Sequence, residues 1–216
     1  MQVKICGIMS EEAALAACEA GADVIGFVFA ESRRKISPER AAELRRLFPN
    51  NVKAAGVFVN ETLENIKHIA EVANLDYIQL HGDETPEFCA SVPNKVVKAF
   101  SIRTKADLDR LLDYDNHVDY FLLDSPGTDF RGGSGIPFDW DLLRDLPIER
   151  SKFILAGGLH AGNVQTAIKQ VQPIMVDVSS GVETNGVKDL EKIRAFIKNA
   201  KLEESTKNGN LHITRS

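Results

Sequence analysis

A cysteine and a lysine near the N-terminus have the types and the spacing expected of reactive groups. Residues 2–6 form an apolar segment that contains Lys4 and ends at Cys6, and Gly7 follows directly. Side chains alternate along a β-strand, so Lys4 and Cys6 would point to the same side. A cation near a thiol favours the thiolate, and glycine lets a ligand approach the backbone. The alternative interpretation of Cys6 is a small buried residue that closes a core strand.

Charged groups follow two other apolar segments. Asp124 ends the segment 119–124, where partial desolvation would raise its pKa toward a value useful for a general acid or base. Its alternative role is to cap a loop or a helix. Arg33 and Arg34 lie in the loop after the segment 23–29, where an arginine could bind a carboxylate through its planar fork of N–H donors. A solvated charged loop is the alternative there.

Three more polar residues stand where strand-like segments end: Gln79, His81 and Asp177. His81 could bind or orient a ligand, although a lone histidine is more often structural. Gln79 and Asp177 are predicted substrate contacts because of their positions at these ends. The spacings of histidine and cysteine indicate no metal site.

Glycine-rich loops follow three of the later apolar segments. Gly157-Gly158 comes after one of them and Ser180-Gly181 after the last. Glycine lets backbone N–H groups point at phosphate oxygens, so these two loops form the candidate phosphate site, with ordinary turns as the alternative. The third and longest loop is a candidate flap over the ligand, or a disordered segment, and its glycine-rich part is Gly132, Gly133, Ser134 and Gly135.

An alternation of strand-like and helix-like segments would position these residues. The segments of strand length are 2–6, 23–29, 53–59, 76–80, 95–100, 119–124, 152–156 and 174–178. The helical patterns are 10–20, 37–48, 62–73, one that begins at 85, 105–112, 138–143, 161–170 and 187–200. Continuous apolar runs predict parallel strands buried on both faces, and eight βα units predict a single (β/α)8 TIM barrel. In such a barrel the active site lies at the C-terminal ends of the strands, where the candidate residues fall.

The competing fold is a doubly wound open sheet. Such a sheet would carry a G-x-G-x-x-G phosphate loop after its first strand, and residues 6–10 match that pattern poorly. We therefore expect one catalytic barrel domain over residues 1–200. The polar residues 201–216 are expected to form a disordered tail.

The composition restricts the partners and the setting of the protein. The chain has 216 residues and a formal net charge of −5, which argues against nucleic-acid binding. Neither a run of about 18 apolar residues nor an N-terminal secretory pattern is present, so no membrane association is expected. An odd number of cysteines, three, predicts a reducing, cytoplasmic setting. The helix patterns carry no large apolar stripe, so a monomer is expected, with a dimer as the alternative.

Taken together and in this order, the residues resemble the phosphoribosylanthranilate isomerase family. The resemblance extends from Val3 to about Ala200. Its motifs include Lys4-Ile5-Cys6-Gly7-Ile8, Ser32-Arg33-Arg34-Lys35, Gln79-Leu80-His81-Gly82, Leu123-Asp124, Gly132-Gly133-Ser134-Gly135, Ala156-Gly157-Gly158-Leu159 and Ser179-Ser180-Gly181-Val182-Glu183. The resemblance implies a (β/α)8 barrel and an Amadori rearrangement in the tryptophan pathway. In this reaction phosphoribosylanthranilate, an aminoaldose, becomes an aminoketose.

The resemblance also implies roles for the candidate residues. Cys6 would be the general base and Asp124 the general acid. Arg34, with Arg33 as the alternative, would bind the anthranilate carboxylate, and the two glycine loops would hold the phosphate. The imine forms from the nitrogen of the substrate, so neither a cofactor nor a metal is required. The rival functions are a sugar-phosphate epimerase and a non-catalytic barrel that binds a phosphorylated ligand.

Both proposed proton transfers depend on protonation states. Asp124 must hold a proton that it can donate to the ribose ring oxygen. Cys6 must be a thiolate, whereas an unperturbed thiol with a pKa of about 8.5 is only a few per cent ionised at neutral pH. We expect Lys4 and the positive iminium of the intermediate to favour the thiolate.

Overall fold

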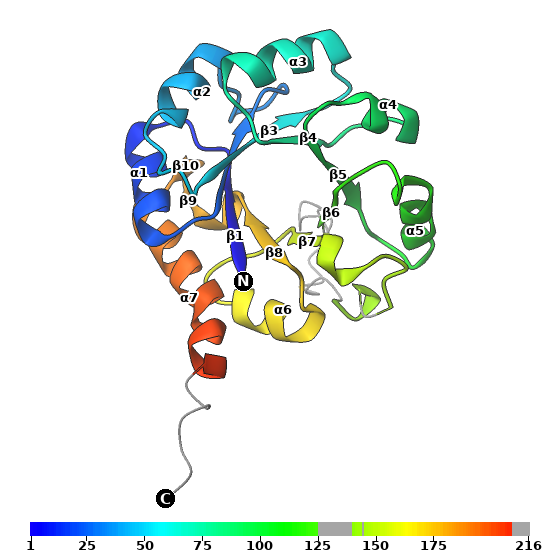
Figure 1. Ribbon diagram of the computed structural model, residues 1–216. Helices are drawn as coiled ribbons and strands as arrows, with labels where there is room; N and C mark the ends of the chain where they lie inside the picture. Colours follow the sequence, from blue (N-terminus) through cyan, green and yellow to red (C-terminus); the bar gives the residue numbers. More distant parts are fainter. Residues whose placement is uncertain (125–139, 144, 209–216) are drawn as a thin grey trace, which may run out of the picture.

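The computed structural model describes residues 1–124, 140–143 and 145–208. Its centre is a closed barrel of eight parallel strands in the order β1 to β8, with helices around the outside (Figure 1). The strands are β1 Gln2–Cys6, β2 Val24–Val28, β3 Lys53–Phe58, β4 Tyr77–Leu80, β5 Lys95–Ser101, β6 Tyr120–Asp124, β7 Phe153–Ala156 and β8 Met175–Val178. Because β1 pairs with both β2 and β8, the sheet closes on itself and the predicted (β/α)8 barrel is confirmed.

Helices connect successive strands and cover the outside of the barrel. The α-helices are α1 Glu11–Ala20, α2 Pro38–Arg45, α3 Leu63–Val72, α4 Pro86–Ser91, α5 Ala106–Asp109, α6 Val164–Val171 and α7 Leu190–Asn208. The 3₁₀ helices are η1 Arg110–Tyr114, η2 Trp140–Leu143, η3 Arg150–Lys152 and η4 Ser180–Val182. Each of the first four α-helices follows a cap whose hydroxyl accepts a backbone N–H three residues later: Ser10, Ser37, Thr62 and Thr85. These caps explain why the sequence predicts the beginnings of these helices well.

The strands are buried on both faces, as their continuous apolar runs predict. Outward-facing residues pack with the helices in a cluster that includes Phe27, Phe121 and Phe196. Inward-facing residues of several strands form a second cluster, whose members are Val24, Ala55, Val97, Ala99, Leu122, Ile154, Ala156 and Met175. Side-chain alternation places Lys4 and Cys6 on this inner face of β1. The two residues therefore share a side, as expected.

A two-stranded hairpin follows β8 where the sequence pattern suggested the start of the last helix. It consists of β9 Glu183–Thr184 and β10 Val187–Lys188, which pair antiparallel. Asn185 and Gly186 connect them, and both have positive φ angles of 53° and 80°. Asn-Gly with two positive φ angles is the preferred type I′ hairpin turn, which explains the break before α7. The expected helical segment 187–200 is therefore wrong at its beginning.

The C-terminal end of the last helix also differs from the expectation. α7 continues past Ala200 to Asn208, so residues 201–208 of the expected disordered tail are helical. The hydrophobic face of its first turns, including Ile193 and Phe196, is buried against the barrel, and a helix anchored in this way can propagate into polar residues. Residues 209–216 lie outside the described part. Within the described part, no helix is both long and apolar enough to cross a membrane.

Candidate active site

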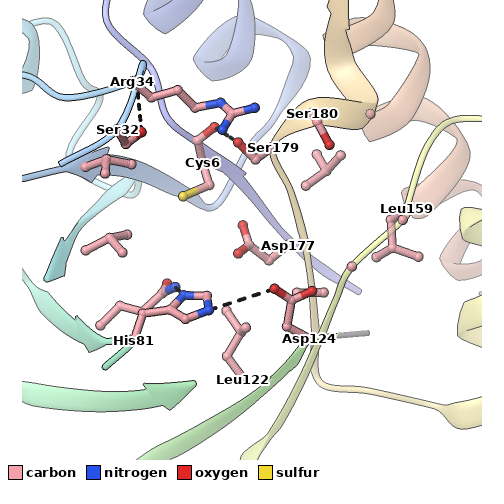
Figure 2. Close-up of a pocket in the computed structure, with 18 residues that line it drawn as sticks. Cys6, Ser32, Arg34, His81, Leu122, Asp124, Leu159, Asp177, Ser179 and Ser180 are labelled. Atoms are coloured by element: carbon pink, nitrogen blue, oxygen red, sulfur yellow. Dashed lines mark hydrogen bonds and ion pairs between the residues drawn. The ribbon is translucent and has the colours of Figure 1, made fainter. Parts of the chain in front are cut away.

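A cavity of about 340 Å³ opens at the C-terminal ends of the barrel strands. Its lining includes most of the described candidate residues, namely Cys6, Arg34, Gln79, His81, Asp124, Gly157, Gly158, Asp177, Ser180 and Gly181. Figure 2 shows the sulfur of Cys6 and the carboxyl group of Asp124 on different sides of this space, with Asp177 between them. The candidate flap residues Gly132, Gly133, Ser134 and Gly135 lie outside the described residues.

The thiol of Cys6 is buried at the end of β1. Burial raises the pKa of Cys6 above its ordinary value, because a thiolate loses its hydration there. The positive charge of Lys4 acts in the opposite direction, as the sequence predicts, but it does not outweigh burial. Before a ligand binds, Cys6 is therefore a neutral thiol at pH 7. Lys4 thus lowers the pKa of Cys6, as expected, but the net pKa is still raised and the thiolate is not favoured.

Lys4 is held beneath the cavity by two partners. Its Nζ donates to Gln79 Oε1 at 2.6 Å and to Asp177 Oδ2 at 3.0 Å. Burial alone would lower the pKa of Lys4, but Asp177 and Cys6 raise it above its ordinary value, so the ammonium is charged. The second oxygen of Asp177, Oδ1, is buried without a hydrogen-bond partner among the described residues. A buried acceptor that lines a cavity is suited to accept a hydroxyl of a ligand.

The orientation of the Gln79 amide determines which ring nitrogen of a neutral His81 carries the proton. Because Gln79 Oε1 accepts from Lys4, its amide nitrogen faces Nδ1 of His81 at 3.3 Å and donates to it. In a neutral imidazole the proton then resides on Nε2, and burial lowers the pKa of His81, which favours the neutral ring. This Nε2 lies 3.8 Å from Oδ2 of Asp124.

Asp124 is a carboxylic acid that holds its proton to a higher pH than an ordinary aspartic acid does. Its pKa is raised to about 6: burial raises it most, the negative charge of Asp177 adds to this, and the positive charge of Lys4 acts in the opposite direction. The position of Asp124 at the end of β6 leaves the carboxyl group at the cavity surface. This environment agrees with the desolvation expected from the sequence and suits a general acid.

Of the two adjacent arginines, Arg34 is the one that lines the cavity. Its Nε and Nη2 donate to the two carboxylate oxygens of Glu183 at 2.6 and 2.9 Å. Arg33 also donates to Glu183, but its side chain is 59% exposed to solvent and lies outside the cavity lining. Gly7 has a φ of 77°, and a Cβ on it would lie 2.5 Å from Cδ of Arg34. A side chain at position 7 would therefore displace Arg34.

Two glycine loops line the side of the cavity at β7 and β8. Gly157 and Gly158 have φ angles of 81° and 61°, which L side chains rarely adopt. At Gly181 a Cβ would lie 1.8 Å from the carbonyl oxygen of Leu159, so the two loops touch there. The glycines of both loops are thus required by the backbone, and the loops together present backbone groups to one part of the cavity.

The sequence interpretation included Ser179 only as part of the loop after β8, and it missed Glu183 and Lys188 as neighbours of the site. Lys188 Nζ donates to the carbonyl oxygen of Ser179 at 2.8 Å and to Glu183 Oε1 at 2.9 Å. Ser179 Oγ donates to the carbonyl oxygen of Cys6 at 3.2 Å. The Asn185-Gly186 turn could have revealed the hairpin and the pairing of its acidic and basic residues.

Fold and cavity together define a barrel enzyme of the (β/α)8 class, with a candidate active site at the C-terminal ends of the strands. Residues 3–199 match the family model of N-(5'phosphoribosyl)anthranilate (PRA) isomerase. The chain belongs to this isomerase family, and the family expected from the sequence motifs is confirmed.

Curated relatives and solved structures show the same similarity. N-(5'-phosphoribosyl)anthranilate isomerase of Bacillus mycoides (strain KBAB4) is 52% identical over 202 residues, which cover 93% of this chain and 98% of the relative. The corresponding protein of Bacillus cereus (strain ATCC 14579) is 50% identical over 200 residues, or 92% and 98% of the two chains. The structure of the Thermotoga maritima enzyme superposes with a TM-score of 0.84 at 44% identity, covering 93% of this chain and 98% of the other.

A further solved relative contains a ligand. This phosphoribosyl anthranilate isomerase, in complex with reduced 1-(o-carboxyphenylamino)-1-deoxyribulose 5-phosphate, is 42% identical and has a TM-score of 0.81. The match covers 93% of this chain and 98% of the relative.

Proposed function

We propose that this chain converts N-(5'-phosphoribosyl)anthranilate to 1-(2-carboxyphenylamino)-1-deoxy-D-ribulose 5-phosphate in tryptophan biosynthesis. The observation that carries the proposal is that one cavity holds both Cys6 and a partly buried Asp124 whose pKa is raised to about 6. Family membership supports the same reaction. The reaction requires an acid that protonates the ribose ring oxygen and a base that removes the proton from C2. Asp124 and Cys6 both line the cavity in which the substrate would lie.

In the first step Asp124 donates its proton to the ribose ring oxygen. The bond between this oxygen and C1 breaks, and the lone pair of the anthranilate nitrogen forms the C1=N bond of an iminium ion. Asp124 is left as a carboxylate. The N–H of His81 Nε2, held toward Asp124 through Gln79, stabilises this charge.

In the second step Cys6 removes the proton from C2 as a thiolate. The electrons of the C2–H bond form C1=C2 and neutralise the iminium nitrogen, and the resulting enaminol tautomerises to the aminoketose. Because burial raises the pKa of Cys6, the positive iminium supplies the charge that favours the thiolate. The base is thus active mainly when the ring-opened intermediate is bound.

The remaining candidate residues fit separate parts of the substrate. The Arg34 guanidinium would bind the anthranilate carboxylate, and the loops of Gly157-Gly158 and Ser180-Gly181 would bind the phosphate. The Oδ1 of Asp177, which has no hydrogen-bond partner among the described residues, would accept a ribose hydroxyl. Figure 2 supports this division, since Arg34 lies at one end of the cavity and Asp124 at another.

The activity is tested by fluorescence. The purified protein is mixed with N-(5'-phosphoribosyl)anthranilate, and loss of the anthranilate-type emission is followed against the uncatalysed rate. A rapid, enzyme-dependent loss supports the proposal. A rate equal to the uncatalysed one would contradict it, and the same ligand in a binding titration would then identify a non-catalytic barrel.

Oligomeric state and location belong to the same proposal. We propose a monomer, because the exposed large hydrophobic side chains of the described part are few and belong to different elements and loops: Met9, Leu15, Val59, Leu112, Val187 and Leu202. A relative from Thermotoga maritima is described as dimeric. Light scattering after size exclusion distinguishes the two states. A cytoplasmic location follows from the unpaired cysteines Cys6, Cys18 and Cys89.

A further inference from the structure

The hairpin after β8 carries an acidic and a basic residue directly opposite each other. In the antiparallel register Lys188 pairs with Glu183, and the Lys188 Nζ lies 2.9 Å from Glu183 Oε1. Their side chains are only 5% and 4% exposed to solvent. The Asn185-Gly186 turn fixes this register, because a two-residue loop leaves no slack between the strands. The local backbone of the hairpin therefore holds Glu183 and Lys188 in position to form this buried ion pair next to the cavity.

Glu183 occupies one edge of the Arg34 guanidinium. It accepts one hydrogen bond from Nε and one from Nη2, in the bidentate geometry that fits a planar fork. A guanidinium has five N–H donors in one plane, so three of them, on Nη1 and Nη2, are left for other acceptors. The Arg34 side chain is 19% exposed and lines the cavity. Because Glu183 binds the Nε–Nη2 edge of the guanidinium, the Nη1–Nη2 edge is the one that can bind a ligand.

The charge of Glu183 is secured over the physiological pH range. Burial alone would raise the pKa of Glu183, but hydrogen bonds from Arg34 and Lys188 lower it to about 2. The carboxylate therefore stays ionised and keeps both bonds to Arg34.

Lys188 connects the hairpin to the end of β8. Besides Glu183 it donates to the carbonyl oxygen of Ser179, whose hydroxyl donates to the carbonyl oxygen of Cys6. Because Cys6, Ser179 and Arg34 all line the cavity, the hairpin is tied to the site at two points. Rotation of Arg34 about its side-chain bonds would break the contacts of a buried network.

We propose that Glu183 and Lys188 are positioning residues that hold the free edge of Arg34 toward the cavity and so determine the affinity for an aromatic carboxylate. This inference rests on the proposed function, in which Arg34 binds the anthranilate carboxylate. It assigns specificity to a hairpin outside the barrel sheet. The carboxylate contact is made in the ground state and in the transition state alike, so losing it raises KM more than it lowers kcat.

The test compares two ligands that differ only in the carboxyl group. They are the reduced product analogue, 1-(o-carboxyphenylamino)-1-deoxyribulose 5-phosphate in reduced form, and its phenylamino counterpart without the carboxyl group. Binding of both is measured by calorimetry for the wild type, Glu183→Gln and Lys188→Met. Glu43→Gln is the matched control, because it removes an exposed carboxylate that pairs with Arg40 on the outer helix α2.

For Glu183→Gln we expect binding of the carboxylated ligand to weaken about tenfold, because a glutamine can accept from only one of the two nitrogens. Lys188→Met should weaken binding of the carboxylated ligand about threefold. In this variant Glu183 still accepts hydrogen bonds from Arg34 but no longer receives the hydrogen bond from Lys188. The phenylamino ligand should bind all four proteins alike. The KM of Glu183→Gln should rise by a similar factor, with kcat within about twofold of the wild type.

Two results would overturn the inference. One is equal weakening of both ligands, which indicates a general structural defect. The other is unchanged binding of the carboxylated ligand in both variants. If Glu183→Gln does not fold by circular dichroism, Lys188→Met alone decides. A wild-type protein that binds the two ligands equally would contradict the proposed role of Arg34 itself, and so separates the failure of the proposed function from that of the hairpin.

Discussion

His81 directs its Nε2 at the carboxyl group of Asp124, 3.8 Å from Oδ2. This relationship depends on a chain of contacts that starts at Lys4, whose ammonium fixes the amide of Gln79, which in turn fixes the imidazole. At 3.8 Å the two groups are too far apart for a strong hydrogen bond. They can approach once Asp124 has lost its proton, and the contact then stabilises the carboxylate when the reaction produces it.

The profile of kcat/KM against pH should rise up to about pH 6 and then level off, and the change of slope reports the ionisation of Asp124. Above this pH the protonated fraction of Asp124 falls tenfold per unit while the thiolate fraction of Cys6 rises tenfold, so their product is constant. Below it Asp124 stays protonated and the thiolate fraction alone falls. Steady-state rates between pH 5 and 9 check this.

The variant Asp124→Asn is the control for that change of slope. Its residual kcat/KM should keep rising with pH through 6, because only the thiol titrates. A change of slope that remains near pH 6 in this variant would assign the ionisation to another group.

Alkylation of Cys6 in the empty site should be slow at neutral pH. Burial raises the pKa of this thiol, so the rate with iodoacetamide, followed by mass spectrometry of the Cys6 peptide, should rise without a plateau up to pH 9. Lys4→Met should react more slowly still at each pH, because Lys4 lowers this pKa. A plateau at or below pH 8 in the wild type would show that the thiolate is already favoured without substrate.

Asp124→Asn should make the folded protein more stable at pH 8. The pKa of Asp124 is raised to about 6 in the folded state, above its unfolded value, so the favourable contribution of its protonated form is lost as pH rises through 6. The neutral amide avoids this loss, and discounting for partial exposure we expect a gain of about 1–2 kcal/mol at pH 8. Urea unfolding at pH 8 and pH 4 measures it, and at pH 4 the gain should vanish. Equal stability of the two proteins at both values would refute the raised pKa.

Replacing Arg34 and Arg33 in turn should separate their roles. Arg34→Ala is expected to raise KM at least about 30-fold, because a charge-assisted bidentate contact is lost. Arg33→Ala should change KM less than about threefold, since this side chain is 59% exposed to solvent and lies outside the cavity lining. Initial rates at varied substrate concentrations give both values. A larger effect at Arg33 would transfer the carboxylate contact to it.

Much of the barrel follows from the sequence because its signals are local. Strand residues such as Val3 and Ile5 are continuous and apolar, and caps such as Ser10 and Thr62 mark the helix starts. The site residues at strand ends follow from the barrel geometry, which brings Cys6 and Asp124 into one cavity.

The parts that were left open or missed depend on contacts between distant residues. Whether Arg33 or Arg34 lines the cavity depends on the packing of Arg34 over Gly7, and no spacing reveals it. The net pKa shift of Cys6 depends on how completely the fold removes water, which the nearby Lys4 does not indicate. Glu183 pairs with Arg34 across 149 residues of sequence. The sequence does contain the Asn185-Gly186 turn signal, but the expected helix was begun at residue 187, which lies in the second strand of the hairpin.

The central claim, that Cys6 and Asp124 are the base and the acid of one isomerisation, is tested most directly by turnover of N-(5'-phosphoribosyl)anthranilate in Cys6→Ala and Asp124→Ala. The fluorescence assay should show kcat lowered by about 10³-fold or more in each variant, with circular dichroism unchanged and binding of the reduced product analogue retained. The wild type should turn over readily in the same assay. Near-normal kcat in either folded variant would contradict the account.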